Sequence, residues 1–322
     1  MPTCLILASK GKKGHERQAL AIAQRLGLDT IVRVVGERSD TLTILSELER
    51  IRPAVVIGAG RQSIAPARAI ARRPNPRPLV AILQPVVWRP KEFDLVWAPL
   101  HDGTSIPYGR RHRLETLTAP SAVTADERAR GAAWIASRVS DLPAPRIGVL
   151  IGGASRAHSF GVDEANDLAS RLAAFAEAHE ASLLVSTSRR TGAAETAILR
   201  DRLRTVAHIF VDPTDPASCA PVDPSIAYAG IVERATAFVV TADSVAMLSD
   251  AAATGKPIYG WRLPGGKAKF DLFYQGLLDH GAMRWFDGSL KSWKYDPLDA
   301  ASVIADTLGA SLGLLDHAQH RI

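Results

Sequence analysis

The sequence predicts an α/β protein of two lobes, each with a parallel β-sheet covered by helices. Short apolar runs alternate with helical segments along the whole chain, and this alternation is typical of parallel sheets. It is interrupted once, at Asp141-Leu-Pro-Ala-Pro145, and then starts afresh. A chain of 322 residues also has the length of two ordinary domains. We therefore expect an N-terminal lobe at 1–144 and a C-terminal lobe at 145–322.

The first lobe begins with a strand, a glycine loop and a helix. Thr3 to Ser9 is apolar, and the loop is followed by a helical face that consists of Ala19, Ile22, Ala23 and Leu26. Further strands are expected at 30–35, 54–58, 79–83, 94–98 and 113–117, with helices at 42–50, 64–72 and 126–140.

The second lobe repeats the pattern, and its clearest stretch runs from Ala237 to Trp261. Asp243 and Ser244 are residues that cap helices, Gly255 suits a left-handed helix end, and these signals bracket a helix at 245–254. Other helices are expected at 163–179, 270–280 and 299–309, and strands at 146–151, 183–186, 208–211, 238–241 and 258–261.

The composition indicates a globular protein of a reducing compartment. Hydrophobic residues make up 47% of the chain, which is enough for a sizeable core. Cys4 and Cys219 are the only cysteines, and they form neither a disulfide framework nor a zinc motif. The apolar run at 4–8 is too short for a signal peptide or a membrane span. We therefore expect a cytoplasmic protein.

Positive charge is concentrated in one segment. Arg61 to Arg113 holds ten Arg or Lys residues against three acids, whereas the net charge of the whole chain is +6. Such a segment favours an anionic membrane surface or a phosphorylated substrate, and the alternative is a solvated face. Aromatic residues are 6% of the chain and no nucleic-acid module is visible, so we expect no nucleic-acid partner.

Three loops that follow strands of the second lobe carry residues suited to phosphate. Two glycines let a ligand approach the backbone, guanidinium groups clamp phosphate, and a helix N-terminus favours anions. A carboxylate about two turns further along that helix could hold a ribose. The candidates are Gly152, Gly153, Ser155, Arg156, Ser188, Arg189, Arg190, Asp243, Ser244 and Asp250. Tight turns, solvated arginines and an ordinary βαβ unit are the alternatives.

The first lobe offers a loop and a histidine. Gly11, Lys12, Lys13 and Gly14 lack the spacing of a phosphate-binding P-loop, so we expect a flexible loop that faces the acceptor. His15 follows it and could act as a general base, because imidazole titrates near neutral pH. Helix capping or simple exposure of this side chain is the alternative.

Other motifs are incomplete. Gly58-Ala-Gly60-Arg-Gln-Ser63 has serine where a dinucleotide fingerprint needs its third glycine. The segment around Ser155 resembles a hydrolase nucleophile elbow, with Asp243 and His280 in the right order, but Ala157 breaks that motif. No Asp-x-Asp pair or histidine spacing calls for a metal, so arginines, lysines and helix ends must neutralise any diphosphate.

Together these stretches resemble a family of glycosyltransferase-like proteins grouped with a plant mitochondrial-fission factor named for elongated mitochondria. The resemblance covers most of the chain and rests on Gly11-Lys-Lys-Gly-His15-Glu, Ile151-Gly-Gly-Ala-Ser155, Ser186-Thr-Ser-Arg189-Arg190-Thr, Asp243-Ser-Val-Ala-Met247 with Thr254-Gly-Lys-Pro257, and Lys269-Phe-Asp-Leu-Phe273 to Met283-Arg-Trp-Phe286.

The resemblance implies the GT-B fold, in which two Rossmann-like lobes flank an interlobe cleft that holds the site. In such folds a carboxylate five residues before a Gly-x-Pro turn holds the nucleotide ribose; Asp250 has that spacing from Gly255, although Glu is more usual. The last helix, at about 297–313, is expected to pack back toward the N-terminal lobe. The acceptor is expected on that lobe, with the basic segment against lipid phosphates at the inner face of the membrane.

Three functions stay open on this basis. The first is metal-independent transfer of a sugar, without a cofactor, from a nucleotide diphosphate donor to a lipid-linked or cell-surface glycan. In it the loops of the second lobe stabilise the leaving diphosphate, Asp250 holds the ribose and His15 deprotonates the acceptor. The second is a non-catalytic peripheral membrane adaptor, like the plant member. The third is a nucleotide-sugar epimerase or hydrolase.

Overall fold

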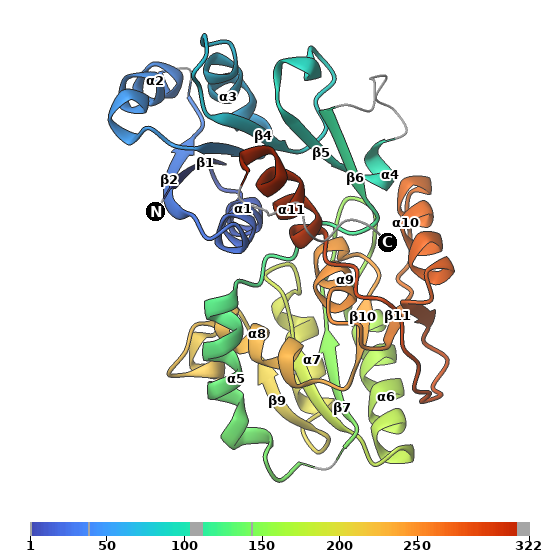
Figure 1. Ribbon diagram of the computed structural model, residues 1–322. Coiled ribbons are helices and arrows are strands. Elements are labelled where there is room, and N and C mark those ends of the chain that lie inside the picture. The colour runs from blue at the N-terminus through green and yellow to red at the C-terminus, as the bar shows by residue number, and fades with distance from the viewer. Residues whose placement is uncertain (1, 38, 104–111, 143, 314–322) are drawn as a thin grey trace. The chain divides into compact units, whose positions relative to one another are not determined.

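The chain folds into two units, and each is built on its own six-stranded parallel sheet (Figure 1). The computed structural model describes residues 2–37, 39–103, 112–142 and 144–313. Unit 1 comprises residues 1–124 and 299–322, and unit 2 comprises residues 125–298. Two parallel sheets with interleaved helices confirm the predicted fold class of two Rossmann-like lobes.

The sheet of unit 1 has the strand order β2-β1-β3-β4-β5-β6, with every neighbouring pair parallel. Its strands are β1 (Thr3–Ser9), β2 (Asp29–Val35), β3 (Val55–Ala59), β4 (Leu79–Leu83), β5 (Leu95–Pro99) and β6 (Arg113–Thr116). Its helices are α1 (Lys13–Arg25), α2 (Asp40–Ile51), α3 (Ile64–Ala71), α4 (Leu100–Gly103) and α11 (Ala300–Leu312), with short 3-10 turns η1 (Arg61–Ser63) and η2 (Pro90–Glu92).

Strand β1 contributes to the core on both faces of the unit 1 sheet, because alternate residues of a strand face opposite sides. Ile6 packs into the cluster with α1, and Leu7 packs into the cluster on the other face. Helix α11 joins the first cluster through Ile304 and Leu308. Figure 1 shows α11, in red, beside α1, in blue, although the two are far apart in the sequence.

An ion pair fixes the start of α11 to the end of α1. Arg25 donates from Nη2 to Asp299 at 3.0 Å and from Nε to the hydroxyl of Ser302 at 3.2 Å. Asp299 also accepts from the backbone N–H groups of Ala301 and Ser302, so the same carboxylate caps α11. Helix α11 is therefore part of unit 1, and it lies within the 297–313 range expected from the sequence.

The sheet of unit 2 has the strand order β12-β11-β10-β7-β8-β9, again parallel throughout. Its strands are β7 (Arg146–Leu150), β8 (Ser182–Ser186), β9 (Ala207–Val211), β10 (Ala237–Thr241), β11 (Ile258–Trp261) and β12 (Met283–Trp285). Its helices are α5 (Ala125–Val139), α6 (Val162–Ala178), α7 (Ala193–Arg202), α8 (Pro224–Arg234), α9 (Val245–Ala252) and α10 (Ala268–Asp279), with the 3-10 turn η4 (Pro216–Cys219).

The start of unit 2 differs from the boundary expected at the prolines around residue 144. Helix α5 packs on α8, so unit 2 begins at Ala125 and not at Pro145. The physical reason is a close helix crossing: a Cβ on Gly131 would lie 2.4 Å from the carbonyl oxygen of Ile226 and 2.5 Å from the nitrogen of Gly230. Only glycine permits this approach, and a contact between distant glycines leaves no periodic signal in the sequence.

Candidate functional site

Each sheet has one point where the strand order reverses, and open α/β sheets bind ligands in the crevice at that point. In unit 2 the point lies between β7 and β10, because β8 and β9 follow β7 on one side and β10 lies on the other. The loops after β7, β8 and β10 hold nearly all the residues that the sequence suggested for a diphosphate.

The loops after β7 and β8 are joined by hydrogen bonds. The hydroxyls of Ser188 and Thr191 both donate to the carbonyl of Gly152, the second at 2.9 Å. Gly153 and Arg190 form an isolated parallel β-bridge, and the hydroxyl of Thr241 accepts from the N–H of Gly152 at 2.8 Å. Ser188 thus uses its hydroxyl proton within the protein, and its role is to position the loops.

An ion pair between an exposed arginine and a buried carboxylate lies at the centre of this site. Arg190 Nη2 lies 2.6 Å from Asp243 Oδ2, and Nη1 donates to the carbonyls of Gly153 and Ala154 at 3.1 and 3.2 Å. The side chain of Asp243 is 0% exposed, whereas that of Arg190 is 41% exposed. Neither oxygen of Asp243 has a hydrogen-bond partner in the part of the chain that the structure describes. Asp243 holds one side of the guanidinium and leaves its other side accessible.

The two glycines of the β7 loop are required by this packing. A Cβ on Gly152 would lie 2.1 Å from Asp243 Oδ2, which is closer than a carbon and an oxygen atom can approach without a bond. Gly153 has φ +126°, and its Cβ would lie 2.4 Å from the backbone of Arg190. The sequence suggested these glycines for a close ligand approach. In the structure, their lack of a side chain leaves room for the protein's own Asp243–Arg190 pair.

Helix α9 begins as expected, but only one of its two proposed caps takes part. The Ser244 hydroxyl accepts from the N–H of Met247 at 3.3 Å, which confirms this residue as the N-cap. Asp243 does not cap the helix, because its carboxylate turns to Arg190. Gly255 has φ +72°, as a left-handed helix end requires.

Asp250 lies inside α9 and is buried. Its Oδ2 accepts from the phenol of Tyr228 at 2.9 Å, so the carboxylate has a protein partner. The rise of a helix puts it about 9 Å along the axis from Ser244. A ribose would have to displace or share the Tyr228 contact to be bound by this residue.

The remaining diphosphate candidates are at the surface. Arg156 and Arg189 are exposed. Ser155 is also exposed, and its hydroxyl accepts from the N–H groups of Ala157 and His158, both at 3.1 Å. That pattern is a local turn, so Ser155 shapes the loop while the two arginines keep their guanidinium groups in solvent.

His158 belongs to the same site, and sequence reasoning missed it. The phenol of Tyr274 donates to the carbonyl of Ala242 at 2.6 Å, so its oxygen can only accept from His158 Nε2, 3.3 Å away. Nδ1 of His158 is buried without a hydrogen-bond partner among the described residues. Burial lowers the pKa of His158, Asp243 and Asp271 oppose this shift, and Arg190 adds to it. The ring is therefore neutral, with Nδ1 as an unused acceptor.

No periodicity or ligand spacing marked His158, because it stands alone in an irregular loop. A second loop supports it: His158 and Gly265 form an antiparallel bridge, and the N–H of Gly266 donates to the carbonyl of Ala157 at 2.6 Å. Gly265 follows β11, the next strand of the sheet. Four loops at one edge of the sheet thus form the candidate site.

In unit 1 the strand order reverses between β1 and β3, and His15 lies there. A Cβ on Gly60, just after β3, would be 2.9 Å from Nδ1 of His15 and 2.6 Å from the hydroxyl of Ser9. His15 is in the first turn of α1, and its residue surface is largely exposed. Partial burial of the imidazole and the Lys12 ammonium lower the pKa of His15. The neutral ring is thus favoured near pH 7, as a general base requires.

The loop before His15 is exposed along its length. Gly11 has φ +73°, and Lys12 precedes α1 without a side-chain cap. Lys12, Lys13 and Gly14 are exposed, so the loop is available for contact with a ligand. Its role as an acceptor loop stays a prediction.

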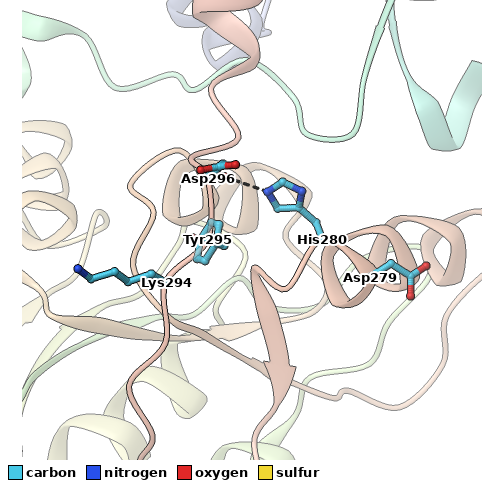
Figure 2. A pocket seen from close by; sticks show the side chains of 5 residues that line it. All are labelled: Asp279, His280, Lys294, Tyr295 and Asp296. Carbon is cyan, nitrogen blue, oxygen red and sulfur yellow. Dashed lines mark hydrogen bonds between the residues drawn. The ribbon is translucent and has the colours of Figure 1, made fainter.

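The hydrolase alternative is not assembled. His280, the candidate triad histidine, lines a surface pocket with Asp279, Lys294, Tyr295 and Asp296, and its Nε2 is 2.8 Å from the carbonyl of Asp296 (Figure 2). Ser155 holds a turn and Asp243 pairs with Arg190, so each of the three residues has other partners. Across the described residues, no group of three His, Cys, Asp or Glu side chains is arranged to hold a metal ion.

The two Rossmann-like units, each with one strand-order reversal, give the protein a GT-B-like fold. The family follows from the sequence comparison. A family model described as "Mitochondrial fission ELM1" matches residues 13–312, and the chain belongs to this family.

Two relatives show how far the similarity extends. The chain is 27% identical over 288 residues to "Mitochondrial fission protein ELM1" of Arabidopsis thaliana, a match that covers 82% of this chain and 65% of the plant protein. It therefore spans about two thirds of that relative. It is 24% identical over 296 residues to "Uncharacterized protein RP120" of Rickettsia prowazekii, covering 82% of this chain and 81% of that one.

Solved structures resemble the fold at low identity. A UDP-N-acetylglucosamine 2-epimerase from Rickettsia bellii matches with a TM-score of 0.50 and 9% identity, covering 98% of this chain and 96% of that one. MurG from Acinetobacter baumannii matches with a TM-score of 0.46 and 16% identity, covering 97% and 91%. At such identities the likeness concerns the fold and not the reaction.

Proposed function

We propose that the protein transfers a sugar from a nucleotide diphosphate donor to a lipid-linked or cell-surface glycan, without a metal ion. The observation that carries the proposal is the anchored guanidinium of Arg190 at the strand-order reversal of unit 2. In this reaction class the leaving nucleoside diphosphate gains charge in the transition state, and fixed donors stabilise it there.

Arg190 has donors to spare for this task. A guanidinium has five N–H donors. Two serve the carbonyls of Gly153 and Ala154, so five less two leaves three, of which those on Nη2 also face Asp243 in the ion pair, and the side chain is 41% exposed. Because the protein already fixes the orientation of the group, little ordering entropy remains to be lost when phosphate binds.

Asp243 neutralises much of the charge on Arg190, so a diphosphate needs further positive groups. Arg156 and Arg189 are exposed on the two joined loops, and the N-terminus of α9 adds its partial charge. In the proposal these three features neutralise the diphosphate, Gly152, Gly153, Ser155 and Ser188 shape the loops around it, and Asp250 binds the ribose after it exchanges the Tyr228 phenol for the sugar hydroxyls.

The acceptor hydroxyl must lose a proton during transfer, and we assign this step to His15. Its neutral ring at pH 7 can accept a proton, and its place at the strand-order reversal of unit 1 is where a ligand of that unit would bind. The acceptor itself would lie against the loop Gly11 to Gly14.

A second candidate is a peripheral membrane adaptor without turnover. Membership of a family described by mitochondrial fission supports it, as does the basic segment 61–113. Of that segment, residues 104–111 lie outside the described residues. None of the described helices is long and apolar enough to cross a membrane.

A turnover assay separates these functions. Purified protein is incubated with UDP-, GDP-, CDP- and ADP-sugars, with and without a bacterial lipid extract as the acceptor, and nucleoside diphosphate release and sugar epimers are measured. Release that requires the extract supports the transferase. Release or epimerisation without the extract indicates a hydrolase or epimerase, and no conversion of any donor favours the adaptor.

A further inference from the structure

We propose that a rigid tip of unit 1, Val87 and Trp88, inserts into the headgroup region of an anionic bilayer while Arg72 and Arg89 face its phosphates. This inference deepens the membrane contact considered above, but it depends on no residue of the sugar-transfer site.

The tip exposes two large apolar side chains. Val87 is 74% exposed and Trp88 is 59% exposed. Val86, directly before them, and Pro90, two residues after Trp88, are buried. The loop after β4 is thus anchored at both ends and directs these two side chains into solvent.

The exposed conformation is held by the protein and is not a loose excursion. Arg68 donates from Nη2 to the carbonyl of Trp88 at 2.6 Å, and its guanidinium lies between the rings of Trp88 and Phe93, at 4.7 and 5.3 Å. Glu92 pairs with Arg68 through Nε at 2.9 Å and with Arg72 at 2.8 Å. A preorganised apolar tip loses little entropy on insertion.

The charge around the tip fits an anionic surface. Arg68, Arg72, Arg89 and Lys91 surround it against the single carboxylate of Glu92, so four less one gives a local balance of +3. Tryptophan favours the level of the lipid headgroups, and each basic residue near an anionic membrane contributes about 1 kcal/mol.

A nucleic acid is the less suitable occupant. Arg68 and Arg89 lie over the ring of Trp88, at 4.7 and 4.8 Å from its centroid, so they compete with a base for the ring face. Val87 beside it is aliphatic and offers no stacking surface. The combination of an aliphatic residue, the exposed edge of an indole and flanking arginines matches an interfacial anchor.

The test is cosedimentation of the full chain with vesicles made of equal parts phosphatidylcholine and phosphatidylglycerol, and with vesicles of phosphatidylcholine alone. We expect binding to the mixed vesicles that falls with added salt. The double variant Val87→Ser with Trp88→Ser should bind about tenfold or more weakly, since burial of one such side chain already accounts for about one factor of ten. Arg89→Gln should weaken binding about fivefold, as one basic residue implies.

Matched controls exclude a general loss of hydrophobicity or charge. Leu272→Ser removes an apolar side chain that is 57% exposed in unit 2, and Arg130→Gln removes an arginine that is 57% exposed. Both should bind vesicles like the wild type, and thermal unfolding should show that all variants are folded.

Three results would overturn the inference. One is wild-type protein that does not sediment with the mixed vesicles; another is equal loss of binding in the tip variant and in Leu272→Ser. The third is protein that does not bind vesicles but forms a complex with a single-stranded oligonucleotide, or a dimer in light scattering, and loses that complex or dimer when Val87 and Trp88 are replaced. Donor turnover, read on the same samples, reports separately on the sugar-transfer site.

Discussion

Removal of Arg190 should destabilise unit 2, chiefly because it leaves the buried carboxylate of Asp243 without its ion-pair partner. At 2.6 Å and an effective dielectric constant of about 20, the Coulomb attraction of the pair is about 6 kcal/mol. Desolvation of the fully buried carboxylate offsets much of this, and solvent screens an arginine that is 41% exposed. We therefore expect a coupling free energy of about 1–3 kcal/mol between the two side chains.

The assay is a double-mutant cycle of urea unfolding with Arg190→Leu, Asp243→Asn and the double variant. The hydrogen bonds from Arg190 to Gly153 and Ala154 are lost wherever Arg190 is absent, so they cancel in the coupling. The control cycle uses Arg204 and Asp201, a pair at 2.8 Å whose side chains are 71% and 73% exposed. It should give less than about 0.5 kcal/mol.

A coupling free energy for Arg190 and Asp243 no larger than that for Arg204 and Asp201 would contradict this prediction. That result would mean that the two side chains are not paired in solution, and Arg190 would lose its fixed orientation. The account of a preorganised phosphate donor would then have no basis.

Three further predictions concern neighbouring groups. Gly153→Ala should destabilise the protein by about 1–3 kcal/mol in urea unfolding, because its Cβ would collide with the backbone of Arg190, whereas Gly14→Ala, with nothing within 4 Å, should be nearly neutral. Tyr228→Phe should cost about 1 kcal/mol of stability yet leave nucleotide affinity equal or higher, since it removes one hydrogen bond that competes for Asp250; a lower affinity in calorimetry would contradict the ribose role. The free energy of unfolding should fall as pH drops below 6.5, because the pKa of His158 is lowered in the folded state and the unfolded chain binds the proton first. His158→Asn should show a smaller fall. A fall as large as that of the wild type would argue against the buried neutral ring.

Most of the fold could be predicted because buried parallel strands are short apolar runs and their covering helices are amphipathic. The predicted helix face with Ala19, Ile22 and Ala23 is buried as expected. Strand β12 was missed because three residues, Met283 to Trp285, are too few to show a pattern. Helix α5 was assigned to the wrong side of the boundary because its partner Gly230 is distant in sequence.

The meeting of the loops after β7, β8 and β10 could be predicted, but not the contacts between them. Glycines and arginines after consecutive strands indicated which loops meet, since carboxyl ends of parallel strands share an edge. The pairing of Asp243 with Arg190 could not be read from the sequence, because Asp243 is equally suited to cap α9. His158 gave no signal at all, since its importance comes from Tyr274 and from the loop after β11.

Equilibrium binding of nucleoside diphosphates is the most direct test of the central claim. The thermal shift of the wild-type chain is measured with UDP, GDP, CDP and ADP, alongside Arg190→Leu and the control Arg204→Leu, each against its own ligand-free midpoint. Ligand at about 100 times its Kd should stabilise the wild type and the control by about 2.7 kcal/mol, and Arg190→Leu clearly less. A folded wild-type protein that shifts with none of the four, or an Arg190→Leu variant that shifts as much as the control, would contradict a diphosphate site at the strand-order reversal of unit 2.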